Sequence, residues 1–270
     1  MNDNKAFIDK WESLSVRNKE GIEWSLFVPQ GAKPRTQRQF NLYNYYRFIN
    51  SVISGKNYMS AVELGCGRGT IGLFLNKYDK MKVTLVDIDA GAINLAKENL
   101  SFFGGKADYV VADAQATGLP ANSVDVAVSI GLLEHIPDYR KVLLEEYRIL
   151  KPGGVIINLN IPEKWSAQKF NNIYKGLLRL FFGSKKLQKD YYRNGDKPEQ
   201  YLAAAAEAGF KNCSVMNVNP FTIWTPIPQW CEYPLALLYR CILWCRGFFM
   251  KEPLKTNYLF SQGHFLVGYK

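Results

Sequence analysis

Three alternating glycines, Gly65, Gly67 and Gly69, interrupt an otherwise apolar stretch in the first third of the chain. Glycine allows the backbone to turn sharply and leaves no Cβ between the main chain and a ligand. A glycine-rich loop that leads into a helix therefore predicts a site where main-chain N–H groups hold a nucleotide-like ligand. The spacing of Gly67, Gly69 and Gly72 also fits the dinucleotide-binding fingerprint. The loop alone leaves two classes of ligand open.

Acidic residues in or after three successive predicted strands distinguish these two classes. Glu63 lies two residues before the loop, and its carboxylate suits a cationic, methionine-like ligand end better than a pyrophosphate. Asp87 ends the next strand and is placed to accept both hydroxyls of a ribose, which either class of ligand has. Asp113 ends the third strand and suits an adenine amino group. Because open α/β sheets bind ligands at the carboxyl ends of their strands, this third acid favours S-adenosylmethionine over NAD.

Six short segments, in a particular order and spacing, carry a resemblance to a known family. They are VELGCGRG (62–69), LVDID (85–89), ADA (112–114) with LP (119–120), DVAVS (125–129), LEHIPD (133–138) and LKPGG (150–154). Together they resemble the class I S-adenosylmethionine-dependent methyltransferases of the type 11 small-molecule family. The resemblance implies S-adenosyl-L-methionine as the cofactor and S-adenosyl-L-homocysteine as the product.

The fold class that the resemblance implies is α/β, with a Rossmann-like, seven-stranded, mostly parallel sheet and helices on both faces. Alternating strand and helix patterns over 60–160 predict the same parallel sheet. Thr70 is expected to cap the helix that starts at Ile71. The expected organisation is an N-terminal helical cap (1–56), a cofactor-binding core (57–160), a substrate-side insertion or lid (161–200), and the C-terminal part of the fold (201–270) with a second, hydrophobic insertion (219–262).

The motifs and residue types also give a set of expected cofactor-binding residues. The set is Glu63, Gly65, Cys66, Gly67, Asp87, Ile88, Asp113, Ala114 and Ile130. Arg38 and Tyr43, on or beside a helix predicted over 40–49, are further candidates for the cofactor carboxylate or the substrate. For Tyr43, the competing interpretation is that it packs its helix against the sheet.

His135 follows the fourth predicted strand and is the candidate catalytic residue. A neutral imidazole there could take a proton from a hydroxyl substrate. The competing interpretation is a pocket-shaping role, because relatives with different substrates carry a similar histidine. Some relatives carry Glu-x-x-Glu-His at this point and bind a divalent metal, but Gly131 stands in place of the first glutamate, so no metal is expected. DNA-base amino methylation is not expected either, because the only similar motif, at 219–221, comes far too late.

Composition and charge narrow the remaining classes. At 270 residues, 47% hydrophobic and 21% charged, the chain is long enough for one large domain and too apolar for wholesale disorder. Its polar start and its short apolar stretches predict neither a signal peptide nor a membrane span. Five cysteines without CxxC spacing suit reduced thiols in a cytoplasm. The net charge is +10, but residues 57–160 have a net charge of −2, so the positive charge lies outside them. A basic surface of this kind suits binding to nucleic acid, anionic lipid or a phosphorylated substrate, or it merely keeps the protein soluble.

The two insertions combine apolar and basic residues. Residues 166–182 show an amphipathic helical pattern, and residues 235–249 are apolar nearly all round apart from Arg240 and Arg246. The second segment is too short and too charged for a span, and suits a helix that lies in an interface or under a lid. We therefore expect a peripheral enzyme at the inner face of an anionic membrane. The alternative is a lid that closes over a small, water-soluble substrate.

The expected activity is methyl transfer to an oxygen or nitrogen of a small-molecule acceptor. The insertions favour a lipid-like acceptor or a lipid-linked glycan. Two alternatives stay open: an RNA methyltransferase that uses the basic additions to track phosphates, and a non-catalytic, cofactor-binding scaffold subunit. The sequence predicts no oligomeric state.

Overall fold

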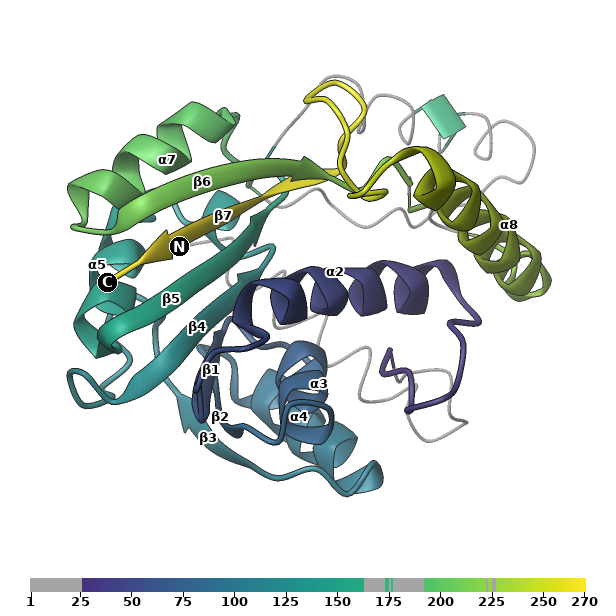
Figure 1. Ribbon diagram of the computed structural model, residues 1–270. Helices are drawn as coiled ribbons and strands as arrows, with labels where there is room; N and C mark the ends of the chain where they lie inside the picture. Colours follow the sequence, from purple (N-terminus) through teal and green to yellow (C-terminus); the bar gives the residue numbers. More distant parts are fainter. Residues whose placement is uncertain (1–25, 163–172, 175, 177–191, 222, 225–226) are drawn as a thin grey trace.

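A computed structural model describes residues 26–162, 173–174, 176, 192–221, 223–224 and 227–270 (Figure 1). Its centre is one seven-stranded sheet with the order β3-β2-β1-β4-β5-β7-β6. The strands are β1 (Ser60–Leu64), β2 (Lys82–Asp87), β3 (Ala107–Val111), β4 (Val124–Ile130), β5 (Leu150–Asn160), β6 (Lys211–Val218) and β7 (Gly263–Tyr269). The first five strands are parallel, and β7 runs antiparallel to both β5 and β6. The predicted fold class is confirmed.

Helices cover both faces of this sheet because its strands are apolar on both sides. The helices are α2 (Gln37–Ile53), α3 (Thr70–Lys77), α4 (Ala90–Phe102), α5 (Arg140–Ile149), α7 (Pro198–Glu207) and α8 (Gln229–Phe249), with a 3₁₀ turn η3 (Leu133–His135). One buried cluster joins α2, α3 and α4 to one face, and a second joins α5 and α7 to the other. Figure 1 shows these two layers on either side of the strands. Burial on both faces is typical of parallel sheets.

The prediction that Thr70 caps α3 is wrong. The helix begins at Thr70 itself, and Gly69 precedes it in the left-handed conformation without a side-chain cap. Instead, Oε2 of Glu63 on β1 accepts a hydrogen bond of 2.7 Å from the N–H of Gly72. A carboxyl group from the neighbouring strand thus replaces the local cap, and its ionised form would complement the positive end of the helix dipole.

Helix α8 lies in the long connection between β6 and β7 and packs on α2 rather than on the sheet. Phe40 of α2, Phe221 and Tyr239 of α8 form a buried aromatic cluster, with the rings of Phe40 and Phe221 5.1 Å apart. Within the described part of the chain, no helix is long and apolar enough to cross a membrane. Most of the amphipathic pattern predicted over 166–182 lies outside the described residues.

Candidate active site

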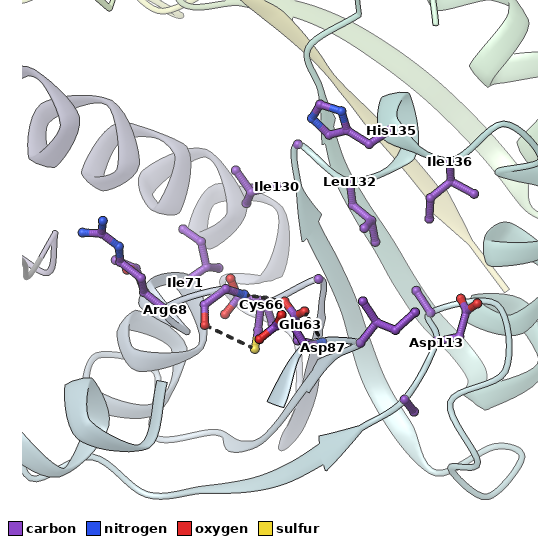
Figure 2. Close-up of a pocket in the computed structure, with 18 of the residues that line it drawn as sticks. Glu63, Cys66, Arg68, Ile71, Asp87, Asp113, Ile130, Leu132, His135 and Ile136 are labelled. Atoms are coloured by element: carbon purple, nitrogen blue, oxygen red, sulfur yellow. Dashed lines mark hydrogen bonds between the residues drawn. The ribbon is translucent and has the colours of Figure 1, made fainter. Parts of the chain in front are cut away.

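A pocket of about 660 Å³ opens at the carboxyl ends of β1, β2 and β4 (Figure 2). This volume is typical of pockets that enclose a nucleoside-sized ligand. Of the residues predicted to bind cofactor or to act in catalysis, the pocket is lined by Arg38, Glu63, Gly65, Cys66, Gly67, Asp87, Ile88, Asp113, Ala114, Ile130 and His135. The topology thus gathers eleven predicted residues from separate parts of the chain at one edge of the sheet.

Tyr43 is the predicted residue that does not line this pocket. Its ring packs against Phe74 of α3, with centroids 6.0 Å apart. It also lines a separate cleft on the α8 side of α2. This position agrees with the packing interpretation, so a cofactor contact is not proposed for Tyr43.

The glycine loop adopts a backbone that other residues would strain. Gly65 and Gly67 have φ angles of 61° and 51°, in the left-handed region that favours glycine. A Cβ on Gly65 would lie only 2.7 Å from the side chain of Leu132. The loop therefore brings its main chain close to the pocket in a way that requires glycine.

Asp87 ties this loop to the end of β2. Its Oδ2 accepts a hydrogen bond of 2.9 Å from the N–H of Gly67, and its Oδ1 accepts one of 3.0 Å from the N–H of Asp89. The side chain is only 8% exposed, and this burial raises its pKa above the usual value. Each carboxylate oxygen can accept a second hydrogen bond, so the group can organise the loop and still bind a ligand.

Glu63 lies deeper in the pocket. It is 4% exposed, and its burial raises the pKa to about 8. The nearby Asp87 carboxylate contributes to this rise in pKa, and hydrogen bonds from the N-terminus of α3 partly oppose it. A cationic group in the pocket would favour the ionised form of this carboxyl group.

The Asp113 carboxylate stands beside Gln115 on the β3 side of the pocket. Its Oδ1 accepts a hydrogen bond of 2.8 Å from the N–H of Gln115. Ala114, between them, is buried, whereas Ile88, which follows β2 and also lines the pocket, is 56% exposed. An exposed apolar side chain in a pocket with polar groups can cover the face of a flat ring system.

His135 is positioned by the η3 turn and by a contact with the main chain at Tyr192. Its Nδ1 lies 2.6 Å from the carbonyl oxygen of Tyr192. A carbonyl only accepts, so the Nδ1 of a neutral ring carries the proton and the lone pair is on Nε2. Nε2 lies 3.9 Å from Oε1 of Glu134, which is 1% exposed and whose pKa is raised to about 7 by burial. A neutral ring fixed in this tautomer can accept a proton at Nε2.

Arginines that the sequence analysis did not single out also line the pocket. Arg68 of the glycine loop is partly buried, and this burial together with the charge of Arg38 lowers its pKa to about 10. Arg193 lines the opposite part and donates to the carbonyl of Ile161 at 3.4 Å. Arg68 stands in a recognised motif and could have been found there. Arg193 lies in the insertion, where no local pattern indicates a pocket.

Comparison with known proteins agrees with this geometry. A family described as "Methyltransferase domain" matches residues 62–158. The ubiquinone/menaquinone biosynthesis C-methyltransferase UbiE of Xanthomonas oryzae pv. oryzae is 32% identical over 177 residues, which cover 58% of this chain and 68% of that protein. The chain belongs to the class I S-adenosylmethionine-dependent methyltransferases.

This methyltransferase is also similar to two more distant proteins, one by sequence and one by structure. It is 27% identical to 2-methyl-6-phytyl-1,4-hydroquinone methyltransferase 1 of Oryza sativa, over 60% of this chain and 44% of that protein. The solved structure of phosphoethanolamine N-methyltransferase 2 of Haemonchus contortus with S-adenosyl-L-methionine matches 84% of this chain and 52% of its own, with a TM-score of 0.55. At 20% identity that likeness shows the fold alone. The chain spans only about half the length of these two proteins.

The cofactor of this methyltransferase is S-adenosyl-L-methionine, and the pocket fits it. The glycine loop lines the pocket with a left-handed backbone at Gly65 and Gly67. Acidic side chains stand at the ends of successive strands, and the buried carboxyl group of Glu63 would gain from a cationic neighbour. Arginines on the α2 side can pair with a carboxylate.

Proposed function

We propose that this methyltransferase transfers a methyl group from S-adenosyl-L-methionine to a hydroxyl oxygen of a small acceptor. The observation that carries the proposal is the fixed tautomer of His135 at the edge of the glycine-loop pocket. A hydroxyl nucleophile benefits from a base that removes its proton, and this ring offers Nε2 for that purpose.

The residues proposed to hold the cofactor follow from their positions. Asp87 would accept hydrogen bonds from the two ribose hydroxyls, and Asp113 would accept one from the adenine amino group. Glu63 would face the cationic methionine end of the cofactor. Arg38 and Arg68 would pair with the cofactor's carboxylate. When bound, the cofactor supplies a methyl group that its sulfonium already activates. The chain's own task is then to align the acceptor and exclude water.

The acceptor is proposed to lie against His135 and the apolar side chains that flank it. Leu132, Ile136 and Pro137 line the pocket on the same side as His135. Such a wall excludes water and favours a flat, apolar ring next to the base. His135 would take the hydroxyl proton at Nε2 as the oxygen attacks, while the Tyr192 carbonyl keeps the ring oriented.

We further propose that the acceptor is lipid-like and is met at a membrane surface. The name of the Oryza relative contains a phytyl-bearing hydroquinone, and the UbiE relative acts in quinone biosynthesis by its name. The pocket is partly open and has an apolar wall, which would accept a ring whose hydrocarbon tail remains outside. Helix α8, which packs on α2, presents exposed apolar side chains.

The test combines binding and turnover. Calorimetry should show micromolar or tighter binding of S-adenosyl-L-methionine and no comparable binding of NAD. Methyl transfer to simple catechols and hydroquinones, with and without a long alkyl chain, should be measured by formation of S-adenosyl-L-homocysteine. Oxygen methylation with a preference for the alkylated acceptor supports the proposal. Cofactor binding with transfer only to nitrogen or carbon acceptors would refute the assignment of oxygen.

A further inference from the structure

The outward side of α8 is apolar, which is the reverse of an ordinary surface helix. Trp230, Leu237 and Trp244 recur every seven residues along α8 and form one stripe, which Phe248 extends by a further turn. The side chains of Trp230, Trp244 and Phe248 are 79%, 68% and 67% exposed. Figure 1 shows α8 at the periphery of the molecule, away from the sheet. Because a surface helix normally turns its apolar face inward, such a stripe indicates contact with another molecule or a membrane.

The charged residues of α8 all lie off this stripe. Glu232 accepts hydrogen bonds from the N–H and side-chain amide of Gln37 on α2. Arg246 donates two hydrogen bonds of 2.8 Å to main-chain carbonyls of the loop that follows the helix. Arg240 faces a cleft of about 550 Å³ between α2 and α8. The outward stripe itself therefore carries no charge.

The cleft joins positive charge to the edge of the apolar stripe. Its lining includes Lys33, Arg47 and Arg240 but no aspartate or glutamate. Within the part of the chain that the structure describes, no ion pair involves any of these three cations. Trp244 and Phe248 of the stripe form part of the same wall. One continuous surface thus offers an anion site directly beside exposed aromatic rings.

We infer that this cleft binds the phosphate of an anionic phospholipid headgroup while the α8 stripe lies in the interfacial layer of the bilayer. The inference rests on the proposed function only in that a lipid-like acceptor would be met at the same surface. Aromatic rings favour the headgroup level, and cations beside them meet anionic lipid. An amphipathic helix of this kind lies parallel to the membrane with its apolar side in the acyl boundary.

A bilayer accounts for this surface better than a second copy of the chain. In a symmetric dimer the same surface meets itself, so Lys33, Arg47 and Arg240 would approach their own copies. The chain has a net charge of +10, which adds repulsion between two copies. An anionic bilayer offers an apolar layer and negative charge together, which matches both parts of the surface.

Vesicle flotation tests this inference with the full chain. Wild-type protein is mixed with vesicles of phosphatidylcholine alone, or of phosphatidylcholine with phosphatidylglycerol, at low and high salt. Arg47→Gln with Arg240→Gln should weaken binding to anionic vesicles about 25-fold, at about fivefold for each cation removed. Trp244→Ser with Phe248→Ser should weaken binding to any vesicle at least tenfold. Phe102→Ser with Lys106→Gln, an exposed pair at the end of α4, is the matched control and should bind as wild type does.

Several results would overturn the inference. Wild-type protein that stays unbound, or that binds neutral and anionic vesicles equally, would remove the headgroup site. So would a cationic variant that binds as wild type does, or calorimetric binding of inorganic phosphate without vesicle binding. Light scattering would assign the stripe to a second copy if wild-type protein formed a dimer and did not bind vesicles, and if Trp244→Ser with Phe248→Ser broke that dimer.

The same samples separate this inference from the proposed function. Both double variants of the cleft and stripe should keep the wild-type affinity for S-adenosyl-L-methionine, because these residues lie outside the cofactor pocket. This affinity also shows that they are folded. Wild-type cofactor binding without vesicle binding would overturn only the headgroup site. Vesicle binding without cofactor binding would overturn only the proposed function.

Discussion

Asp87→Ala is the sharpest test of the proposed cofactor site. In the folded chain the carboxylate accepts the N–H groups of Gly67 and Asp89 at 2.9 and 3.0 Å. With cofactor bound, each oxygen would also accept a ribose hydroxyl. The substitution therefore acts on the loop and on the ligand at once, and the two effects must be measured separately.

The expected loss of affinity follows from two charge-assisted hydrogen bonds. Each contributes about 1.5–3 kcal/mol, so their loss should raise the Kd for S-adenosyl-L-methionine by ~10²–10⁴-fold. The loss of folding stability should be smaller, on the order of 1–3 kcal/mol. Burial raises the pKa of Asp87, which means that the charged group also carries a desolvation penalty that the alanine variant escapes.

Calorimetry gives the affinity, and urea unfolding gives the stability of the same samples. Asp87→Asn keeps the size and one acceptor oxygen, so it should lie between wild type and Asp87→Ala in both measurements. Asp108→Asn, an exposed acid on β3 paired with Lys82, is the matched control and should change neither. A folded Asp87→Ala protein whose Kd stays within threefold of wild type would refute the ribose assignment.

Three further predictions concern the base, the loop and a buried acid. His135→Ala should lower turnover on a hydroxyl acceptor by ~10²–10⁴-fold with little change in cofactor Kd; lost cofactor binding instead would indicate a pocket-shaping role. Gly65→Ala should lower the free energy of unfolding by about 1–3 kcal/mol and weaken cofactor binding more than tenfold. The reason is that φ at Gly65 is 61° and the new Cβ would lie 2.7 Å from the Leu132 side chain. Unchanged calorimetry and urea curves would contradict this prediction. Glu146 is a buried residue of α5, and its burial raises its pKa from 4.5 to about 8. Between these two pH values the folded chain keeps a proton that the unfolded chain releases. The free energy of unfolding therefore falls as pH rises from about 4.5 to about 8. Glu146→Gln should remove up to about 1.4 kcal/mol per pH unit of that slope in urea unfolding between pH 5 and 8, and equal slopes in both proteins would contradict the assignment.

The fold and the centre of the pocket could be predicted because their signals are local. Glycines at fixed spacing and acids at strand ends stand within a few residues of the backbone that needs them, as Gly65 and Asp87 do. The parallel order of the strands then brings these ends to one edge. For the same reason the sequence alone assigns Asp113, 26 residues after Asp87, to the same edge.

The parts that could not be predicted depend on contacts between distant residues. The cap of α3 comes from Glu63, nine residues before the N–H that it binds, so the local rule pointed to Thr70 instead. Arg193 reaches the pocket through the path of an insertion, which has no sequence signal. Similarly, the apolar composition of α8 is visible in the sequence. Which side faces outward is decided by Tyr239 and Ala236, which pack inward.

One helix connects the pocket to the surface that α8 presents. Arg38 of α2 lines the cofactor pocket, whereas Arg47 of the same helix lines the cleft towards α8. The Glu232 carboxylate of α8 accepts the first N–H of α2 at 2.9 Å, where the helix dipole favours negative charge. Gln37 is fully buried at this junction, so the two helices are held by a satisfied polar contact rather than by apolar packing alone. A headgroup in the cleft and a cofactor in the pocket would therefore contact the same rigidly joined helix from different sides, which would place a membrane-borne acceptor beside the reactive end of the pocket without requiring a separate carrier.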